Sequence, residues 1–162
     1  MKRHKSKEIW AKILFAIYSY GHYIKTSIRQ PLLRKILLLP YAILDFLIVR
    51  GVLNCLFPYQ LEVGKGLTIW HPYGIVIHSQ AIIGENVTIR QHVTIGKAHD
   101  EGGLPIIGNN VSIGAGAIII DEIKIGDNTV IGANAVVTKS CPENAVLVGV
   151  PAKNISNSHV EM

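Results

Sequence analysis

An aliphatic residue recurs every six positions through most of the second half of the chain. A period of six fits neither the 3.6-residue turn of an α-helix nor the two-residue alternation of a hairpin strand. It fits a chain wound into short flat strands separated by tight corners, with three hexads in each triangular coil of about 18 residues. The recurring positions, which we expect to fill the interior of the prism, are Ile77, Ile83, Ile89, Ile95, Ile107, Ile113, Ile119, Ile125, Ile131 and Val137.

The predicted corners carry Gly and Asn. The triplets GEN, GNN, GDN and GAN begin at Gly84, Gly108, Gly126 and Gly132. Both residue types tolerate the positive φ angles that tight corners require. Successive coils would then stack as parallel strands about 4.8 Å apart, which makes this part of the chain all-β.

Two interruptions break the repeat. Ile69 and Ile77 are eight residues apart, so two extra residues lie around His71. Ile95 and Ile107 are twelve apart, but Glu101 stands where an aliphatic residue is expected, which predicts that KAHDEGGLP leaves the prism as a loop. Function often concentrates where a scaffold departs from its repeat, so we expect these two interruptions to build the site.

The first 60 residues differ from the rest in charge. Ten Lys or Arg against two acidic residues give residues 1–60 a net charge of +8, whereas residues 61–162 hold six basic and nine acidic residues. Apolar residues at helical spacing predict two or three amphipathic helices. The longest uncharged apolar run, 36–44, is about half the length that a membrane-spanning helix needs. The helices either rest on an anionic membrane surface or pack on the body of the protein or its oligomer.

Five segments carry a resemblance to a known family. They are HPYGIVI (71–77), VTIG (93–96), VSIGAGAII (111–119), IGANAVVTK (131–139) and VGVPAK (148–153). Together they resemble the hexapeptide-repeat acyltransferases, in particular serine acetyltransferases and the related O-acetyltransferases of capsular or exopolysaccharide sugars of the colanic acid type. The resemblance implies a left-handed parallel β-helix acetyltransferase domain at 61–155, after a small α-helical segment at 1–60 and before a tail at 156–162. It also implies a homotrimer with sites shared between chains.

His71 is the candidate general base. An alcohol is a poor nucleophile at neutral pH, and a histidine with an ordinary pKa of about 6.5 suits the removal of its proton. By resemblance, His71 matches the catalytic histidine of the serine enzymes, which transfer acetyl directly from acetyl-CoA in a ternary complex. The backbone N–H of Lys97 or Ala98, just after Gly96, would stabilise the oxyanion.

The remaining candidates surround these groups. Following the hexads through one turn leads from His71 to Gln91 and from Pro72 to His92, so both should stack over the base. His92 either orients the acceptor or shares proton transfer, or else is a solvated corner residue. His99 in the loop either reaches a neighbouring subunit's site or stays on the surface. Trp70 and Tyr73 offer faces for stacking a sugar ring. By resemblance, acetyl-CoA would contact Gly96, Ala98, Gly114, Ala115, Gly132, Ala133 and Lys153.

Departures from the serine enzymes bear on the acceptor. Those enzymes pair their histidine with an upstream Asp, yet no Asp lies between Asp45 and Asp100. Their charged groups for the amino acid correspond here to Trp70, Gly103 and Leu104. The sequence therefore predicts an acetyl-CoA-dependent O-acetyltransferase acting on a sugar hydroxyl of a polysaccharide or its precursor, with serine O-acetylation for cysteine biosynthesis as the alternative.

Metal, nucleic acid and export are not part of this expectation. The γ-class carbonic anhydrases share the fold but need three zinc-binding histidines, and none occurs between His99 and His159. No convincing export signal precedes the two cysteines, Cys55 and Cys141, which we expect to be reduced. We expect a cytoplasmic protein, with peripheral contact at the inner face of the membrane left open.

Overall fold

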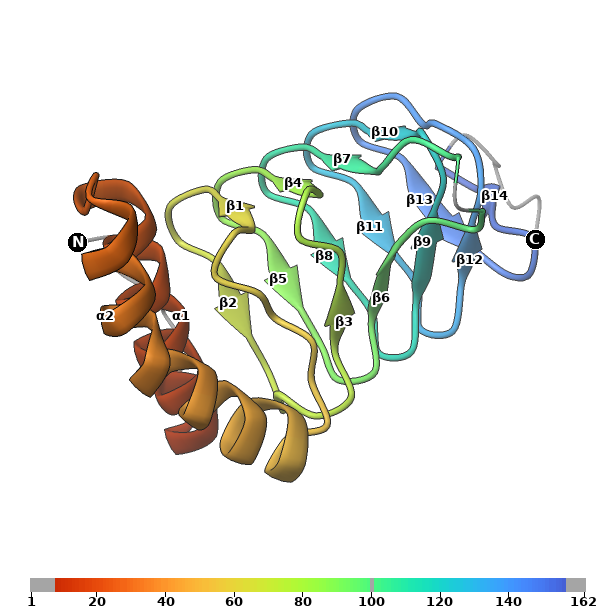
Figure 1. The fold of residues 1–162 in the computed structure, drawn as a ribbon. Helices are drawn as coiled ribbons and strands as arrows, with labels where there is room; N and C mark the ends of the chain where they lie inside the picture. The colour runs from red at the N-terminus through yellow and green to blue at the C-terminus, as the bar shows by residue number, and fades with distance from the viewer. Residues whose placement is uncertain (1–7, 100, 157–162) are drawn as a thin grey trace.

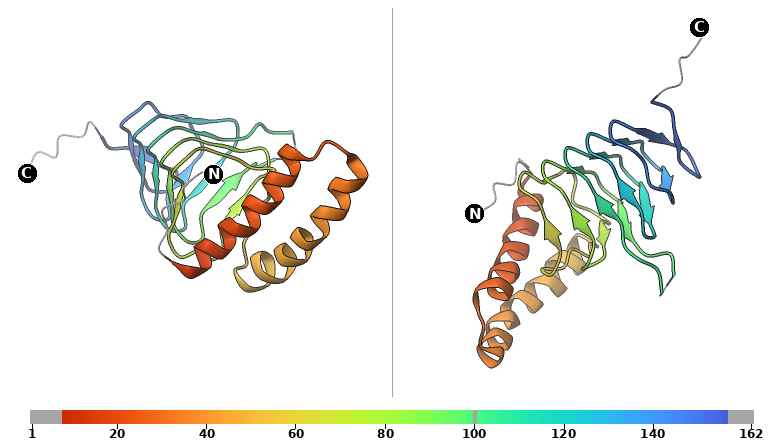
Figure 2. Two further views of the ribbon diagram at one scale, coloured as in Figure 1. Left: turned by 90° about the vertical axis from the view of Figure 1, so that its left-hand side faces the viewer. Right: turned by 90° about the horizontal axis from the view of Figure 1, so that it is seen from above.

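A computed structural model describes residues 8–99 and 101–156 of the chain. Two α-helices, α1 (Ile9–Ser27) and α2 (Pro31–Leu44), come first, and α2 continues directly into the π-helical segment η1 (Asp45–Val52). The rest winds into a three-sided prism of short strands, with the helices lying across its N-terminal end (Figures 1 and 2).

Three parallel sheets form the sides of the prism. The first is β1 (Glu62–Val63), β4 (Ile82–Ile83), β7 (Ile106–Ile107) and β10 (Lys124–Ile125). The second is β2 (Thr68–Ile69), β5 (Thr88–Ile89), β8 (Ser112–Ile113), β11 (Val130–Ile131), β13 (Val146–Val148) and β14 (Lys153–Asn154), and only β14 runs antiparallel to its neighbour. The third is β3 (Val76–Ile77), β6 (Thr94–Gly96), β9 (Ile118–Ile120) and β12 (Val136–Val137). The predicted fold, a β-helix of hexapeptide repeats after a helical segment, is confirmed as a parallel β-solenoid.

The repeating aliphatic residues fill the prism. All ten predicted positions from Ile77 to Val137 are at most 2% exposed. Each lies on a strand whose preceding residue faces outward, which is the alternation expected of a two-residue strand with one buried face. The core is therefore built by the hexads themselves.

The strand register locates both interruptions. Ile69 pairs with Ile89, a separation of 20 residues, whereas Ile77 pairs with Ile95, a separation of 18. Two extra residues therefore lie in the corner between β2 and β3, as predicted. Ile95 pairs with Ile119, a separation of 24, and the six additional residues form the loop after β6. Both departures from the repeat are confirmed.

The corners adopt the predicted left-handed conformation. Asn86, Asn110 and Asn128 have φ angles of 54°, 56° and 57°. Their side-chain amides form a ladder along one edge of the prism, in which Asn86 Nδ2 donates to Asn110 Oδ1 (3.3 Å) and Asn110 Nδ2 to Asn128 Oδ1 (3.1 Å). Asn thus satisfies the backbone geometry and links successive coils.

Helix α1 closes the open N-terminal end of the solenoid. Phe15 and Tyr18 of α1 pack edge-on against Phe57, with ring centroids 6.3 Å and 5.3 Å away. The Tyr18 hydroxyl donates to the Leu61 carbonyl oxygen (2.9 Å), and burial, with a smaller contribution from Glu62, raises the pKa of Tyr18 to about 12. Helix and solenoid residues share one continuous core.

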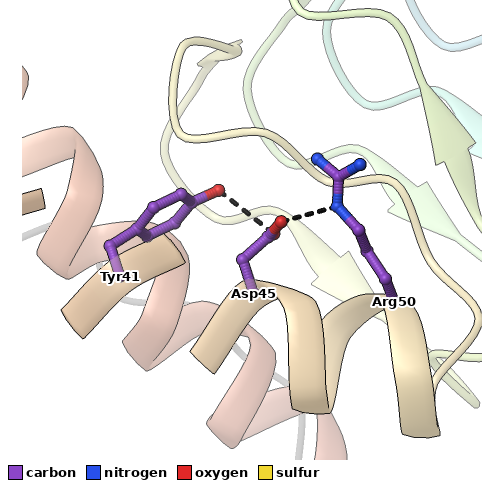
Figure 3. Close-up of polar contacts among 3 residues, drawn as sticks. All are labelled: Tyr41, Asp45 and Arg50. Atoms are coloured by element: carbon purple, nitrogen blue, oxygen red, sulfur yellow. Dashed lines mark hydrogen bonds and ion pairs between the residues drawn. The ribbon is translucent and has the colours of Figure 1, made fainter. Parts of the chain in front are cut away.

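A polar cluster lies on the inner side of α2 and η1 (Figure 3). Asp45, which is 6% exposed, accepts hydrogen bonds from the Tyr41 hydroxyl (3.2 Å) and from Arg50 Nε (2.7 Å). Burial first, and then the Asp45 charge, raises the pKa of Tyr41 well above its ordinary value. None of the helices in the described residues is both long and apolar enough to cross a bilayer.

Candidate active site

One edge of the prism collects most of the candidate residues. The corners between β2 and β3, β5 and β6, β8 and β9, and β11 and β12 lie one above another along this edge. Backbone hydrogen bonds connect them: His92 N–H donates to Tyr73 O (2.8 Å), Gly116 N–H to Gln91 O (3.0 Å) and Asn134 N–H to Ala115 O (2.8 Å). We call this line of corners the site edge.

His71 occupies the first corner of the site edge and is held by Glu8. Its φ angle is 54°, a left-handed conformation that His adopts more readily than most residues. His71 Nδ1 lies 3.1 Å from Glu8 Oε1, and the His71 backbone N–H donates to Glu8 Oε2 (3.0 Å). Glu8 is the N-cap of α1, yet its side chain makes no capping hydrogen bond. The carboxylate instead fixes both the ring and the backbone of His71.

This contact sets the tautomer of the imidazole. A carboxylate offers only acceptor oxygens, so the Nδ1 that faces it carries a proton. In the neutral ring Nε2 is then an acceptor, and it makes no hydrogen bond with any described residue. The His71 side chain is 57% exposed, so Nε2 is open to a ligand. Sequence reasoning missed Glu8 because it lies 63 residues away and belongs to the helical segment.

Cys55 supports the same corner from inside the protein. Its Sγ lies 3.3 Å from the Pro72 carbonyl oxygen and accepts the Ile75 N–H at 3.3 Å. Burial raises the pKa of the Cys55 thiol, which argues against a nucleophilic role. The irregular turn is thus fixed at Glu8 on its outer side and at Cys55 on its inner side.

Trp70 and Tyr73 flank His71 and expose their rings. They are 41% and 38% exposed, enough to offer apolar faces to a ligand beside the imidazole. Gln91 lies one coil above His71, as the register predicted. Its Oε1 is buried and accepts no hydrogen bond from any residue that the structure describes.

The predicted place of His92 needs a correction. Its N–H bonds to Tyr73 O, and a Cβ on Gly74 would overlap His92 Nδ1, so His92 stacks on Gly74 and not on Pro72. The reason is that the two extra residues lie after His71, so the register changes from 20 to 18 residues between Gln91 and His92. His92 is exposed in a left-handed conformation, with φ 58°.

Gly96 and Lys97 lie at the other end of β6. With Val76, His78 and Thr94 they line a groove of about 370 Å³ on the third sheet. A Cβ on Gly96 would meet no atom within 4 Å, so the space beside it is open. The Ala98 N–H donates to Asp121 Oδ1 (3.2 Å), so the structure engages one of the two predicted oxyanion donors. Within one chain, the width of the third sheet separates the two groups: His71 comes before the start of β3, and Lys97 comes after the end of β6.

The other residues assigned to acetyl-CoA are spread over the coils. The packing of the coils by itself requires glycine at position 114, because a Cβ on Gly114 would stand 2.5 Å from the Ala133 nitrogen in the next coil. Lys153 is exposed on β14, and His99 is exposed in the loop after β6. Ala115, Gly132 and Ala133 belong to corners of the site edge. No three His, Cys, Asp or Glu side chains among residues 8–99 and 101–156 gather as a metal site.

Comparison with known proteins identifies the family. Residues 105–139 match the family described as bacterial transferase hexapeptide (six repeats). The Escherichia coli K12 protein assigned by name to colanic acid biosynthesis, the acetyltransferase WcaB, is 34% identical over 141 residues, which cover 84% of this chain and 85% of that protein. The chain belongs to the hexapeptide-repeat transferase family. It is therefore an acyltransferase, as its sequence predicted.

Serine acetyltransferases are similar over a shorter part of their own length. The Mycobacterium tuberculosis enzyme is 46% identical over 98 residues, 59% of this chain but 43% of that enzyme. The soybean apoenzyme structure superposes with a TM-score of 0.74 and 32% identity over 91% of this chain and 58% of that one. A serine acetyltransferase complex with CoA gives the same TM-score at 31% identity, over 91% of this chain and 57% of that one. This hexapeptide-repeat transferase thus spans about half the length of the serine enzymes that it resembles.

Proposed function

We propose that this transferase moves acetyl from acetyl-CoA to a sugar hydroxyl of a capsular or exopolysaccharide or its precursor, with His71 as general base. The observation that carries the proposal is the bidentate Glu8 contact, which leaves the exposed Nε2 of His71 as the only unengaged ring nitrogen. A relative that this chain matches over 85% of its length is named for colanic acid biosynthesis, and a serine acetyltransferase of known structure is named as a complex with CoA.

The reaction follows from this arrangement. Nε2 accepts the proton of the acceptor hydroxyl as its oxygen attacks the thioester carbonyl carbon. The oxyanion that forms needs a preorganised donor, for which the Lys97 N–H is the candidate. Collapse breaks the carbon–sulfur bond, and the imidazolium returns its proton to the departing thiolate of CoA. The products are an O-acetyl ester and free CoA.

A trimer would complete the site. His71 and Lys97 lie at opposite edges of one sheet, so a single chain does not bring base and oxyanion donor together. A cyclic arrangement of identical prisms can place the loop after β6 of one chain beside the site edge of the next. Acetyl-CoA would then lie between chains, near the open space at Gly96 and along the site edge.

The acceptor side favours a neutral sugar. Trp70 and Tyr73 provide aromatic faces beside the base. Such faces can pack against the apolar C–H surfaces of a carbohydrate ring. Gly103 and Leu104 in the loop offer no charge to an amino acid. These features favour a sugar over serine.

Release of CoA with different acceptors tests the proposal. With acetyl-CoA and the purified full chain, we expect turnover with glycan fragments from the host and none above background with L-serine. NMR of the product should place the acetyl group on a ring hydroxyl. Faster release with serine than with every glycan would overturn the acceptor, although acetyl transfer itself would stand.

The Glu8 contact gives a second test. Glu8→Gln should lower kcat about 10- to 100-fold with little change in the KM for acetyl-CoA, because it weakens the hold on the base without touching the donor. Glu8→Asp, which keeps the charge on a shorter side chain, should recover part of the loss. Equal kcat values for wild type and Glu8→Gln would remove the positioning role.

A further inference from the structure

The outward face of α2 and η1 is apolar. Leu32, Ile36, Leu39 and Ile43 follow one another at spacings of four, three and four residues, which places them on one face of the helix. Their exposed fractions lie between 52% and 71%. Two residues of η1 continue this face, at 70% and 56% exposure. We call the six residues the α2 stripe: Leu32, Ile36, Leu39, Ile43, Phe46 and Leu47.

The opposite face of the same helix carries the polar groups. Tyr41 and Asp45 are buried there, and Arg50 pairs with Asp45 on that side (Figure 3). A surface helix of a globular protein has the reverse arrangement, with its apolar side inward. A contiguous exposed apolar surface of this kind marks an interaction site. Something other than water is expected against the α2 stripe.

The charge around the α2 stripe restricts what can cover it. Arg29, Arg34 and Lys35 are exposed within residues 28–52, whereas Arg50, the fourth basic residue of this range, pairs with Asp45 on the opposite face. The only acidic residue in that range is Asp45, which is buried and paired. A second copy docking through the same face would bring two sets of basic side chains together with no exposed carboxylate from this range to balance them, which disfavours self-association. Anionic lipid headgroups supply the missing charge, and acyl chains supply the apolar surroundings.

We propose that the α2 stripe binds an anionic membrane surface, with α2 and η1 lying in the plane of the interface. Since none of the described helices is long and apolar enough to span a bilayer, the contact is peripheral. The stripe would enter the boundary between headgroups and acyl chains, and the basic side chains would face the phosphates. This inference does not depend on the identity of the acetyl acceptor.

Vesicle flotation of the full chain tests the proposal. We expect the protein to float with vesicles of phosphatidylglycerol and phosphatidylcholine, to bind pure phosphatidylcholine at least tenfold more weakly, and to be released by salt. The variant Ile36→Gln/Leu39→Gln/Ile43→Gln should lose at least tenfold in binding. The matched control is Ile82→Gln/Ile106→Gln, at partly exposed apolar positions of β4 and β7, and it should bind like wild type.

A charge variant and a mass measurement make the test decisive. Lys35→Glu keeps the stripe intact and should weaken binding by at least fivefold, since each basic residue near the surface contributes about that factor. Thermal melts should show that all variants fold. Wild-type protein that fails to float with phosphatidylglycerol overturns the proposal. A stripe variant that binds vesicles normally also overturns it. If the only change in that variant is a smaller assembly measured by light scattering, the stripe is a contact between copies and not a membrane-binding surface.

Discussion

Two edges of the prism use the same backbone for different purposes. On the edge of Asn86, Asn110 and Asn128, left-handed corners carry amides that bond to one another from coil to coil. On the site edge, His71 and His92 adopt φ angles of 54° and 58°, nearly the same conformation, but the His71 ring meets the Glu8 carboxylate instead of a neighbouring corner amide. The corner geometry restricts the residue type to a few choices. Within these choices, one edge has a ladder of three amides that stabilises the stack, and the site edge has two imidazoles in the same line of corners as Asn134.

Replacing the base with the residue of the other edge should have the largest effect. His71→Asn keeps a side chain that tolerates the left-handed corner but removes the general base. We expect kcat to fall by about 10² to 10⁴, with the melting temperature within a few degrees of wild type. The measurement is CoA release under saturating acetyl-CoA. Activity within threefold of wild type would show that His71 is only another corner residue.

Glycines at different edges should separate stability from activity. Gly114→Ala, on the site edge, forces a Cβ against the backbone of the next coil and should lower the free energy of unfolding by about 1–3 kcal/mol. Gly96→Ala, at the end of β6 that lies away from the site edge, has no atom within 4 Å of the new Cβ and should melt like wild type. Urea titrations measure both. If Gly96→Ala also raises the KM for acetyl-CoA, the open space beside Gly96 is where the thioester binds.

Removing the inner support of the His71 corner should have a smaller effect. Cys55→Ala leaves the buried Ile75 N–H without its acceptor, and we expect a loss of about 1–2 kcal/mol in unfolding free energy. Cys141→Ala, which lies far from the site edge, is the matched control. A matching loss of kcat in Cys55→Ala, but not in the control, would show that the irregular turn must be held rigid. Unchanged stability would mean that the sulfur contacts contribute nothing.

The smallest expected effect is the pH dependence of stability contributed by Asp127, next to Asn128 on the edge of amides. Hydrogen bonds first from the Asn109 backbone N–H and then from its side chain lower the pKa of Asp127. A lowered folded-state pKa contributes stability that is complete above the ordinary value of 3.8 and is lost as pH falls through the lower folded value. Wild type should therefore lose melting temperature slightly between about pH 5 and pH 2 relative to Asp127→Asn. Parallel melting curves of the two proteins over this range would contradict the assignment.

Sequence reasoning succeeded where neighbours are set by a fixed register. In a solenoid each coil contacts only the next, so the period alone identifies the buried residues and places Gln91 over His71. It failed for His92 because the spacing of eight residues between Ile69 and Ile77 does not say which two residues of the turn are the extra ones. Only the strand pairing decides this. The role of Cys55 was missed for a related reason, since its contact with Pro72 crosses from one coil to the next before the regular repeat begins.

The amino-acid sequence by itself determined the prism, its core and the two places where chemistry was expected, because hexad periodicity is a local property that repeats. The tertiary structure alone decided what fixes the base and which face of α2 turns away from the rest of the chain. Glu8 meets His71 only because α1 lies across the first coil, and no spacing rule connects residues 63 positions apart. In the same way, the apolar pattern of α2 predicts an amphipathic helix, but only its packing on α1 shows that Tyr41 and Asp45 turn inward and the α2 stripe turns outward.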